Sequence, residues 1–235
     1  MSKEMPVDEI LEKASLGDAN AQCILGKKYE EGDGVTQDFA EALRWYLKAA
    51  EQGDAEAQHG VGYLFGEGKG VTKNKSEAVK WHRKAAEQGH TDAKYFLGLS
   101  YQVGSGVIQD FAEACKWYQQ AAEEGHPVAQ TNYGTLFASG KGVPQDQQEA
   151  VRLYRRAAKQ GYRQAQLELG WCYYKGEGVI QDYVYAHVWF NLAAALGAKG
   201  ADEWRETVAK KLSLEQILEA QKIAREYLNN DYEDC

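Results

Sequence analysis

The stretch that decides the fold is residues 17–52, GDANAQCILGKKYEEGDGVTQDFAEALRWYLKAAEQ. Its pattern returns without insertion at residues 53–88, 89–124, 125–160 and 161–196. The opening glycine therefore recurs every 36 residues, and so do an alanine at the fifth position and a glycine at the tenth. A fixed period of about 20 to 50 residues is typical of an array of stacked structural repeats.

Each repeat is predicted to form two helices joined by a tight turn. In the first half of the first copy, apolar or small residues recur at helical spacing on one face. They are Ala21, Leu25, Gly26 and Tyr29. The second half places a further set on one face, Ala42, Trp45, Tyr46, Ala49 and Ala50. Between the halves, Gly32 can end a helix in a left-handed conformation and Gly34 allows the next turn.

The second helix of each repeat has a candidate N-cap residue. Side-chain oxygens of Asp and Asn accept hydrogen bonds from the free N–H groups of a first helical turn. Such residues precede the second helix in all five copies, as Asp38, Asn74, Asp110, Asp146 and Asp182. We therefore expect five well-defined second helices.

Neither helix of a repeat can bury its apolar face alone, so the copies must stack. The prediction is an all-α protein, a superhelical α-solenoid of five 36-residue helix-turn-helix repeats. Residues 6–16 are expected to form an N-terminal capping helix, and residues 197–230 a C-terminal pair in which Ser213 and Gln216 form a capping box. Residues 231–235 are expected to be a tail. No linker divides the chain, which predicts a single domain over residues 1–235.

These motifs resemble the Sel-one-like repeat (SLR) family, relatives of the tetratricopeptide repeats. The resemblance rests on the run from Ala19 to Val35 and on the segment from Gly125 to Gly161, and it covers residues 6–230. It implies an α-solenoid adaptor or scaffold that holds other proteins. The segment from Trp189 to Ala194, WFNLAA, resembles the final repeat of bacterial members and suggests a bacterial source.

The chain departs from the family pattern at several positions. Leu153 stands in place of the tryptophan in the fourth repeat, and His82 in place of the tyrosine in the second. Cysteine-rich secreted members place a cysteine pair in each repeat, whereas the four cysteines here occupy unrelated positions: Cys23, Cys115, Cys172 and Cys235. Unpaired cysteines favour a reducing compartment. We therefore expect a cytoplasmic protein; a disulfide between two chains through Cys235 stays open.

Charge and hydropathy exclude several classes of partner. The chain has 235 residues, with 27 basic and 35 acidic side chains and a net charge of −8. An acidic chain is a poor candidate for binding nucleic acid or anionic lipid. It has no apolar run long enough for a membrane span, and no signal peptide is visible at its N-terminus. A trimmed leader, and with it a secreted or periplasmic location, stays open.

The sequence contains no clear motif for phosphate binding, metal binding or catalysis. The boxes at Gly66–Gly70 and Ser139–Gly142 lack the Ser or Thr that a phosphate-binding loop carries after its lysine, and a helix precedes each of them. Among the histidines, His59 shares a helix face with Glu56, His90 and His126 are expected to be loop or cap residues, and His187 a core neighbour. No order of residues points to catalysis, a cofactor or a metal, so we predict no enzyme.

The binding surface is predicted on the first helix of each repeat, at positions that vary between copies while the others stay fixed. Because aromatic side chains dominate many interfaces, the predicted partner-binding residues are His59, Tyr63, Tyr95, Leu99, Thr131, Thr135, Leu167, Trp171 and Tyr174. Two alternatives stay open: Tyr95, Leu99 and Leu167 could belong to the core, and Trp171 and Tyr174 could pack under the last helix.

Two functions from different classes follow. The first is an interaction scaffold that holds a partner protein or peptide in a concave groove, with a homodimer as a variant. The second is an enzyme or a binder of small molecules. The weak chemistry and the varied aromatic positions favour the scaffold.

Overall fold

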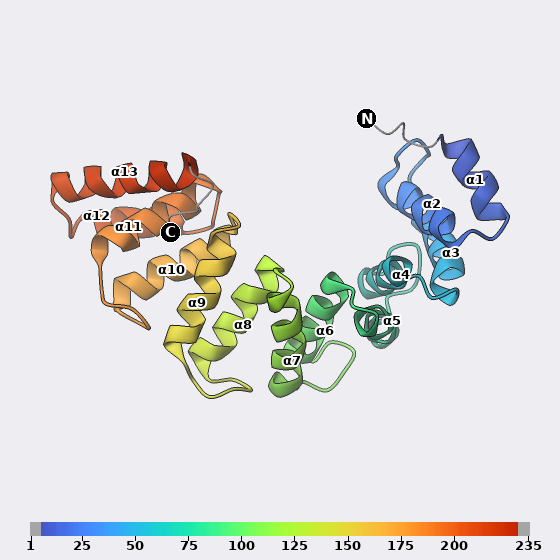
Figure 1. Cartoon of the computed structure of the whole chain (residues 1–235), viewed down its shortest axis with the longest axis horizontal. Coiled ribbons are helices and arrows are strands. Elements are labelled where there is room, and N and C mark those ends of the chain that lie inside the picture. Colours follow the sequence, from blue (N-terminus) through green and yellow to red (C-terminus); the bar gives the residue numbers. More distant parts are fainter. Residues whose placement is uncertain (1–5, 230–235) are drawn as a thin grey trace. The chain divides into compact units, whose positions relative to one another are not determined.

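The computed structural model describes residues 6–229, in which thirteen α-helices and no strand occur (Figure 1). The helices are α1 (Val7–Ser15), α2 (Ala19–Glu31), α3 (Phe39–Glu51), α4 (Ala55–Glu67), α5 (Lys75–Glu87), α6 (Thr91–Val103), α7 (Phe111–Glu123), α8 (Pro127–Ser139), α9 (Gln147–Ala158), α10 (Arg163–Lys175), α11 (Tyr183–Ala195), α12 (Ala201–Ala209) and α13 (Leu214–Asn229). The all-α prediction of five helix pairs with flanking helices is confirmed.

The chain divides into two compact units, Met1–Asp110 and Phe111–Cys235. The first contains α1 to α6 and the second α7 to α13, so the division falls inside the third repeat. Within each unit, helices that follow one another in the chain pack side by side, except that α12 and α13 both pack on α11 (Figure 1). The prediction of a single domain stays a prediction, and each unit is described by itself.

Polar side chains fix the helix starts as expected. Asp38 accepts hydrogen bonds from the backbone N–H groups of Ala40 and Glu41 at 2.9 and 3.1 Å, which caps α3. Two histidines act as caps in the same way. His90 Nδ1 accepts from the N–H of Ala93 at 3.2 Å, and His126 Nδ1 accepts from that of Ala129 at 3.1 Å. The prediction that His90 and His126 are cap residues is confirmed.

The turn between paired helices uses two left-handed glycines. Gly32 ends α2 at φ 76°, and Gly34 follows at φ 73°. In the third repeat the second turn glycine, Gly106, has φ 77° and lies against the start of α5 in the preceding repeat. A Cβ there would overlap the backbone of Lys75, so this glycine is needed for its conformation and for the close approach of two repeats.

The predicted face of the second helix in the first repeat is buried. Ala42, Trp45, Tyr46, Ala49 and Ala50 are all at most 5% exposed. The Tyr46 ring lies between two glycines, Gly26 of its own repeat and Gly60 of the next, where an added Cβ would come within 2.7 to 2.9 Å of the ring. The absence of side chains at both positions is what lets the aromatic ring fill the space between three helices.

A hydrogen-bonded glutamine pair recurs in the first, second and fourth repeats and joins each of them to the preceding helix. The third repeat has Lys94 and Glu124 at these positions. Gln22 donates from Nε2 to the Ala14 carbonyl at 3.0 Å, and its Oε1 accepts from Gln52 Nε2 at 2.8 Å. The fifth repeat also lacks the pair, because Leu196 stands where Gln52 stands in the first. Gln166 Oε1 is consequently buried without a hydrogen-bond partner.

The C-terminal helices close the second unit. α12 and α13 pack on α11, and the predicted capping box is confirmed: the Ser213 N–H donates to Gln216 Oε1 at 2.9 Å, and the Gln216 N–H donates to Ser213 Oγ at 3.2 Å. Leu153 fills the place of the missing tryptophan and is 1% exposed. The predicted tail and Cys235 lie outside the described residues.

Candidate functional site

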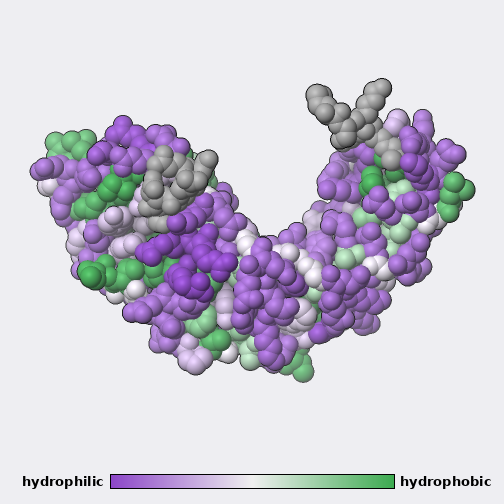
Figure 2. All heavy atoms as spheres, in the orientation of Figure 1, coloured by the Kyte–Doolittle hydropathy of each residue, from purple (hydrophilic) through white to green (hydrophobic). Residues whose placement is uncertain are grey.

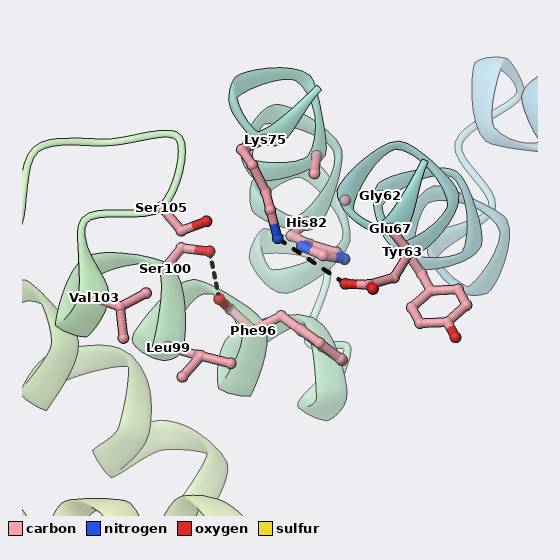
Figure 3. Close-up of a pocket in the computed structure, with 12 residues that line it drawn as sticks. Gly62, Tyr63, Glu67, Lys75, His82, Phe96, Leu99, Ser100, Val103 and Ser105 are labelled. Atoms are coloured by element: carbon pink, nitrogen blue, oxygen red, sulfur yellow. Dashed lines mark hydrogen bonds and ion pairs between the residues drawn. The ribbon is translucent and has the colours of Figure 1, made fainter. Parts of the chain in front are cut away.

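A pocket opens in the first unit between α4, α5 and α6 (Figure 3). Its volume is about 180 Å³. Most of its lining is apolar and includes Ala78, His82, Phe96, Leu99 and Val103. We call it the His82 pocket.

Two changes in the repeat pattern create the His82 pocket. In the first repeat, the Tyr46 hydroxyl donates to Glu30 Oε2 at 2.8 Å, so these two side chains fill the space between their helices. One repeat later the same positions hold His82 and Gly66. Histidine is shorter than tyrosine and glycine has no side chain, so the space that the tyrosine–glutamate pair fills is left open.

His82 is a buried, neutral imidazole. Its side chain is only 3% exposed, and neither Nδ1 nor Nε2 has a hydrogen-bond partner. The ring stacks on Phe96 with centroids 5.0 Å apart. Burial, followed by the charges of His59 and His90, lowers the pKa of His82 to about 3. A neutral imidazole carries one donor and one acceptor, so His82 offers unused hydrogen-bonding capacity at the pocket wall.

The rim of the His82 pocket is charged. Lys75 Nζ lies 4.0 Å from Glu67 Oε1, and both side chains are drawn beside His82 in Figure 3. Both are about half exposed, at 44% and 51%. An exposed ion pair of this kind contributes less than about 1 kcal/mol, so it presents little obstacle to an entering group.

His59 contacts both His82, in the pocket wall, and His90, the N-cap residue of α6. Its ring stacks on His90 at 4.7 Å and lies 5.3 Å from His82. Burial lowers the pKa of His59 to about 4, with the repulsion of His90 as the next cause. His90 Nε2 in turn lies 3.1 Å from Glu56 Oε2. Among residues 6–229 no three His, Cys, Asp or Glu side chains are placed to hold a metal ion.

A second hollow lies beside the pocket and shares Tyr63 with it. We call it the acidic hollow, because three carboxylates line it, Glu30, Glu31 and Glu56, against one ammonium group, Lys27. The Tyr63 ring is directed away from His82 (Figure 3). Its hydroxyl accepts a hydrogen bond from Lys69 Nζ at 2.8 Å, which holds the ridge between the two hollows in place.

The nine predicted binding residues fall in both units. His59, Tyr63, Tyr95 and Leu99 belong to the first, where Tyr63 and Leu99 line the His82 pocket, His59 and Tyr63 line the acidic hollow, and Tyr95 contacts Phe96 edge-on at 5.1 Å. Thr131, Thr135, Leu167, Trp171 and Tyr174 belong to the second. The prediction that these residues bind a partner stays a prediction.

The prediction that Thr131 lies on the surface is wrong. Thr131 is buried, at 3% exposed, and its hydroxyl donates to the Pro127 carbonyl at 2.9 Å. Cys23, at the same repeat position, is also buried. Small side chains at this position are covered by neighbouring helices, whereas the larger His59, Tyr95 and Leu167 are only partly buried.

Trp171 and Tyr174 pack against the C-terminal helices, as the alternative interpretation held. The Trp171 ring lies 4.0 Å from that of Trp204 on α12, and Tyr174 lies 5.8 Å from the same ring. Both belong to a cluster with Phe190 and Val208. The contacts involve α12 rather than the last helix, and both side chains are partly buried.

The predicted binding residues do not include His82, Gly66 or Phe96, although His82 departs from the repeat pattern. The signal was in the repeat positions: His82 stands for tyrosine, Gly66 for Glu30, and Phe96 for Gly60. Each change alone is unremarkable, and only their contact in space makes a pocket. The glycine boxes are helix ends, as the turn reading required, with Gly68 closing α4 at φ 73°.

The rest of the visible surface is mainly hydrophilic, with apolar residues in scattered patches (Figure 2). No helix among residues 6–229 combines the length and apolarity needed to cross a bilayer.

Comparison with known proteins identifies the repeat. The pattern that defines the Sel1 repeat matches residues 19–54, 55–90, 91–126, 127–162 and 163–197. A Sel1 repeat protein from Oxalobacter formigenes is 32% identical, with a TM-score of 0.79, over 94% of this chain and 97% of that one. None of the curated proteins matches the chain.

Two further solved structures are similar. The protective antigen c5321 of uropathogenic Escherichia coli strains, which has an SLR fold, is 35% identical, with a TM-score of 0.83. The match covers 96% of this chain but only 49% of that one, so this chain spans about half of its length. The immunity protein Pa5087 from Pseudomonas aeruginosa is 19% identical over 86% of this chain and 81% of that one, with a TM-score of 0.52, a likeness of fold alone.

Proposed function

The chain belongs to the Sel1 repeat family, and on that premise we propose that it is a protein–protein interaction scaffold that binds a partner polypeptide on the first helices of its repeats. The proposal also includes a reducing, cytoplasmic setting, which the buried and unpaired Cys23, Cys115 and Cys172 support. It includes no catalytic role.

The observation that carries the proposal is the pair of hollows around Tyr63. Repeat positions that hold the fold together keep the same residue type, such as Ala21 and Ala57, and are buried. Several residues around the two hollows differ from their counterparts in the other copies, among them Tyr63, Gly66 and His82, whereas Gly62 and Ala78 keep the residue type of every copy. Variation at the hollows on a constant frame is what partner-specific binding requires, because specificity comes from local side chains on a common frame.

A small-molecule binder is the second candidate. A cavity of about 150 Å³ can hold one aromatic ring, and the His82 pocket, at about 180 Å³, is of that size. The pocket opens beside the acidic hollow, however, and together they make a longer surface than a single ring needs. The polypeptide partner is therefore the better fit to the two hollows together.

The test uses two variants of the protein, one with a photo-crosslinking amino acid in place of Tyr63 and one with it in place of Lys80. Lys80 is exposed on α5 and lines neither hollow. A polypeptide captured from Tyr63 and not from Lys80 is then purified and its affinity measured by calorimetry. Tyr63→Ala should weaken binding by about 2 kcal/mol or more, as for an aromatic anchor. Lys80→Ala should leave it unchanged, and equal effects of the two changes would refute the proposed surface.

A further inference from the structure

We propose that the His82 pocket and the acidic hollow together bind one short segment of the partner, in which a tyrosine lies close to a lysine or arginine. The phenol ring enters the pocket and the cation lies in the hollow. This inference rests on the proposed function and names the chemistry of the segment that is held.

The pocket has the size and lining for one aromatic ring. Its volume of about 180 Å³ slightly exceeds that of a cavity which holds benzene, about 150 Å³. Ala78, Phe96, Leu99 and Val103 supply apolar contacts. The first repeat shows the matching chemistry within the chain, since there the tyrosine of the scaffold itself, Tyr46, reaches the equivalent space with its hydroxyl.

His82 favours tyrosine over phenylalanine. Both of its ring nitrogens are buried without a partner, and an unsatisfied buried polar group is costly. A phenol hydroxyl donates and accepts, so it can pair with a neutral imidazole in either tautomer. Unlike phenylalanine, tyrosine brings to the pocket a hydroxyl group that can pair with His82.

The acidic hollow favours a cation next to that ring. Glu30, Glu31 and Glu56 outnumber Lys27, and the second nearby ammonium group, on Lys69, is engaged by the Tyr63 hydroxyl. The net charge of −8 adds long-range attraction for a cationic segment. Because Tyr63 lines both hollows, the two side chains of the segment need to be separated only by the width of one tyrosine ring.

The binding experiment uses labelled glycine–serine peptides that carry one tyrosine and one lysine at varied spacing, with fluorescence polarisation as readout. Matched peptides replace the tyrosine by phenylalanine or alanine, or the lysine by glutamate. We expect tyrosine to exceed phenylalanine by about fivefold, from one hydrogen bond of about 1 kcal/mol. Alanine or glutamate should lower the affinity further.

Gly66→Gln blocks the pocket without strain. Gly66 has helical backbone geometry, and an added Cβ would meet only the Ala78 Cβ at 3.5 Å. Glutamine also stands at the equivalent position of α6, as Gln102. Replacing a helical glycine favours the helix, so the variant should melt at or above the temperature of the wild type. It should lower peptide affinity by about thirtyfold, whereas Ala138→Gln, at the same repeat position in the second unit, should not.

Replacing two carboxylates of the acidic hollow tests whether the hollow binds the cation of the segment. Glu31→Gln with Glu56→Gln should remove the preference for lysine over glutamate peptides. Glu51→Gln with Glu87→Gln carries the same charge change on residues that line neither hollow and should retain the preference. Equal losses in both pairs would show a general charge effect and overturn the assignment of the cation to this hollow.

The outcomes separate this inference from the proposed function. No binding by any tyrosine–lysine peptide, equal binding of tyrosine and alanine peptides, or unchanged binding to Gly66→Gln overturns the inference. If the captured partner polypeptide binds Gly66→Gln normally but loses affinity for Tyr63→Ala, the scaffold function stands and the tyrosine pocket falls. If neither change weakens the partner, both fall.

Discussion

Gly106→Ala should destabilise the first unit far more than a glycine replacement with similar backbone strain elsewhere in it. Gly106 has φ 77° and lies in the turn between α6 and α7. A Cβ there would overlap the carbonyl group of Lys75 and come within 2.8 Å of the Ser76 nitrogen. Because these are backbone atoms, no side-chain rotation can relieve the overlap.

The matched control is Gly89→Ala. Gly89 has φ 95°, and an added Cβ would meet nothing within 4 Å. Its φ lies farther from the left-handed minimum of about +57° than that of Gly106. The control therefore carries at least as much backbone strain, of about 1 to 2 kcal/mol. Any greater loss of unfolding free energy in Gly106→Ala therefore reports the overlap between the turn and the preceding repeat.

The difference in unfolding free energy between the two variants can be estimated from the contacts that must change. Moving the turn away from α5 breaks the hydrogen bond from Ser76 Oγ to the Gly106 carbonyl, at 3.2 Å, which is worth about 1 kcal/mol. Accommodating the methyl group against backbone costs a further ~1 to 3 kcal/mol, as for other overpacked sites. We expect Gly106→Ala to be less stable than Gly89→Ala by ~2 to 4 kcal/mol, the sum of these costs.

Urea unfolding followed by far-ultraviolet circular dichroism measures the difference in unfolding free energy. Amide hydrogen exchange in α5 and α6 locates it. The largest loss of protection should fall at the start of α5, beside Gly106. Equal stability of the two variants would refute the argument, because it would mean that the turn and the preceding repeat do not constrain each other.

Three further predictions follow from other parts of the structure. The buried His59 and His82 have folded-state pKa values of about 4 and 3, against 6.5 for a free histidine. Their contribution to the unfolding free energy is therefore present above pH 6.5 and falls as the pH drops toward those values, by ~2 kcal/mol per histidine at about pH 5. Urea unfolding of the wild type and of His82→Tyr at several pH values should show a weaker pH dependence in the variant. Leu196→Gln should raise the unfolding free energy by ~1 kcal/mol by giving Gln166 Oε1 a donor, and an unchanged urea midpoint would contradict that pairing. Burial raises the pKa of the Cys172 thiol to about 12, so a thiol reagent at neutral pH should label it only slowly in the folded protein and at once in urea.

The candidate site could be predicted only in part. Tyr63 and Leu99, two of the predicted binding residues, both line the His82 pocket, and their role in binding stays a prediction. The prediction was wrong for Thr131, because a side chain that is small and covered by its neighbours cannot be told from an exposed one by its position in a repeat. Trp171 could be read as an anchor or as core, and its contact with Trp204 became known only from the structure.

The sequence by itself determined the repeat architecture. Five copies of one local pattern place glycines, caps and apolar faces at fixed positions, and each feature acts within a helix or between adjacent helices, so the spacing along the chain carries the information. The structure alone decided where the surface is hollow. The His82 pocket depends on Gly66, His82 and Phe96, which lie on three helices, and on the size of each side chain relative to the others. Whether three such changes leave a space or fill one is a question of packing volume, which spacing along the chain does not record.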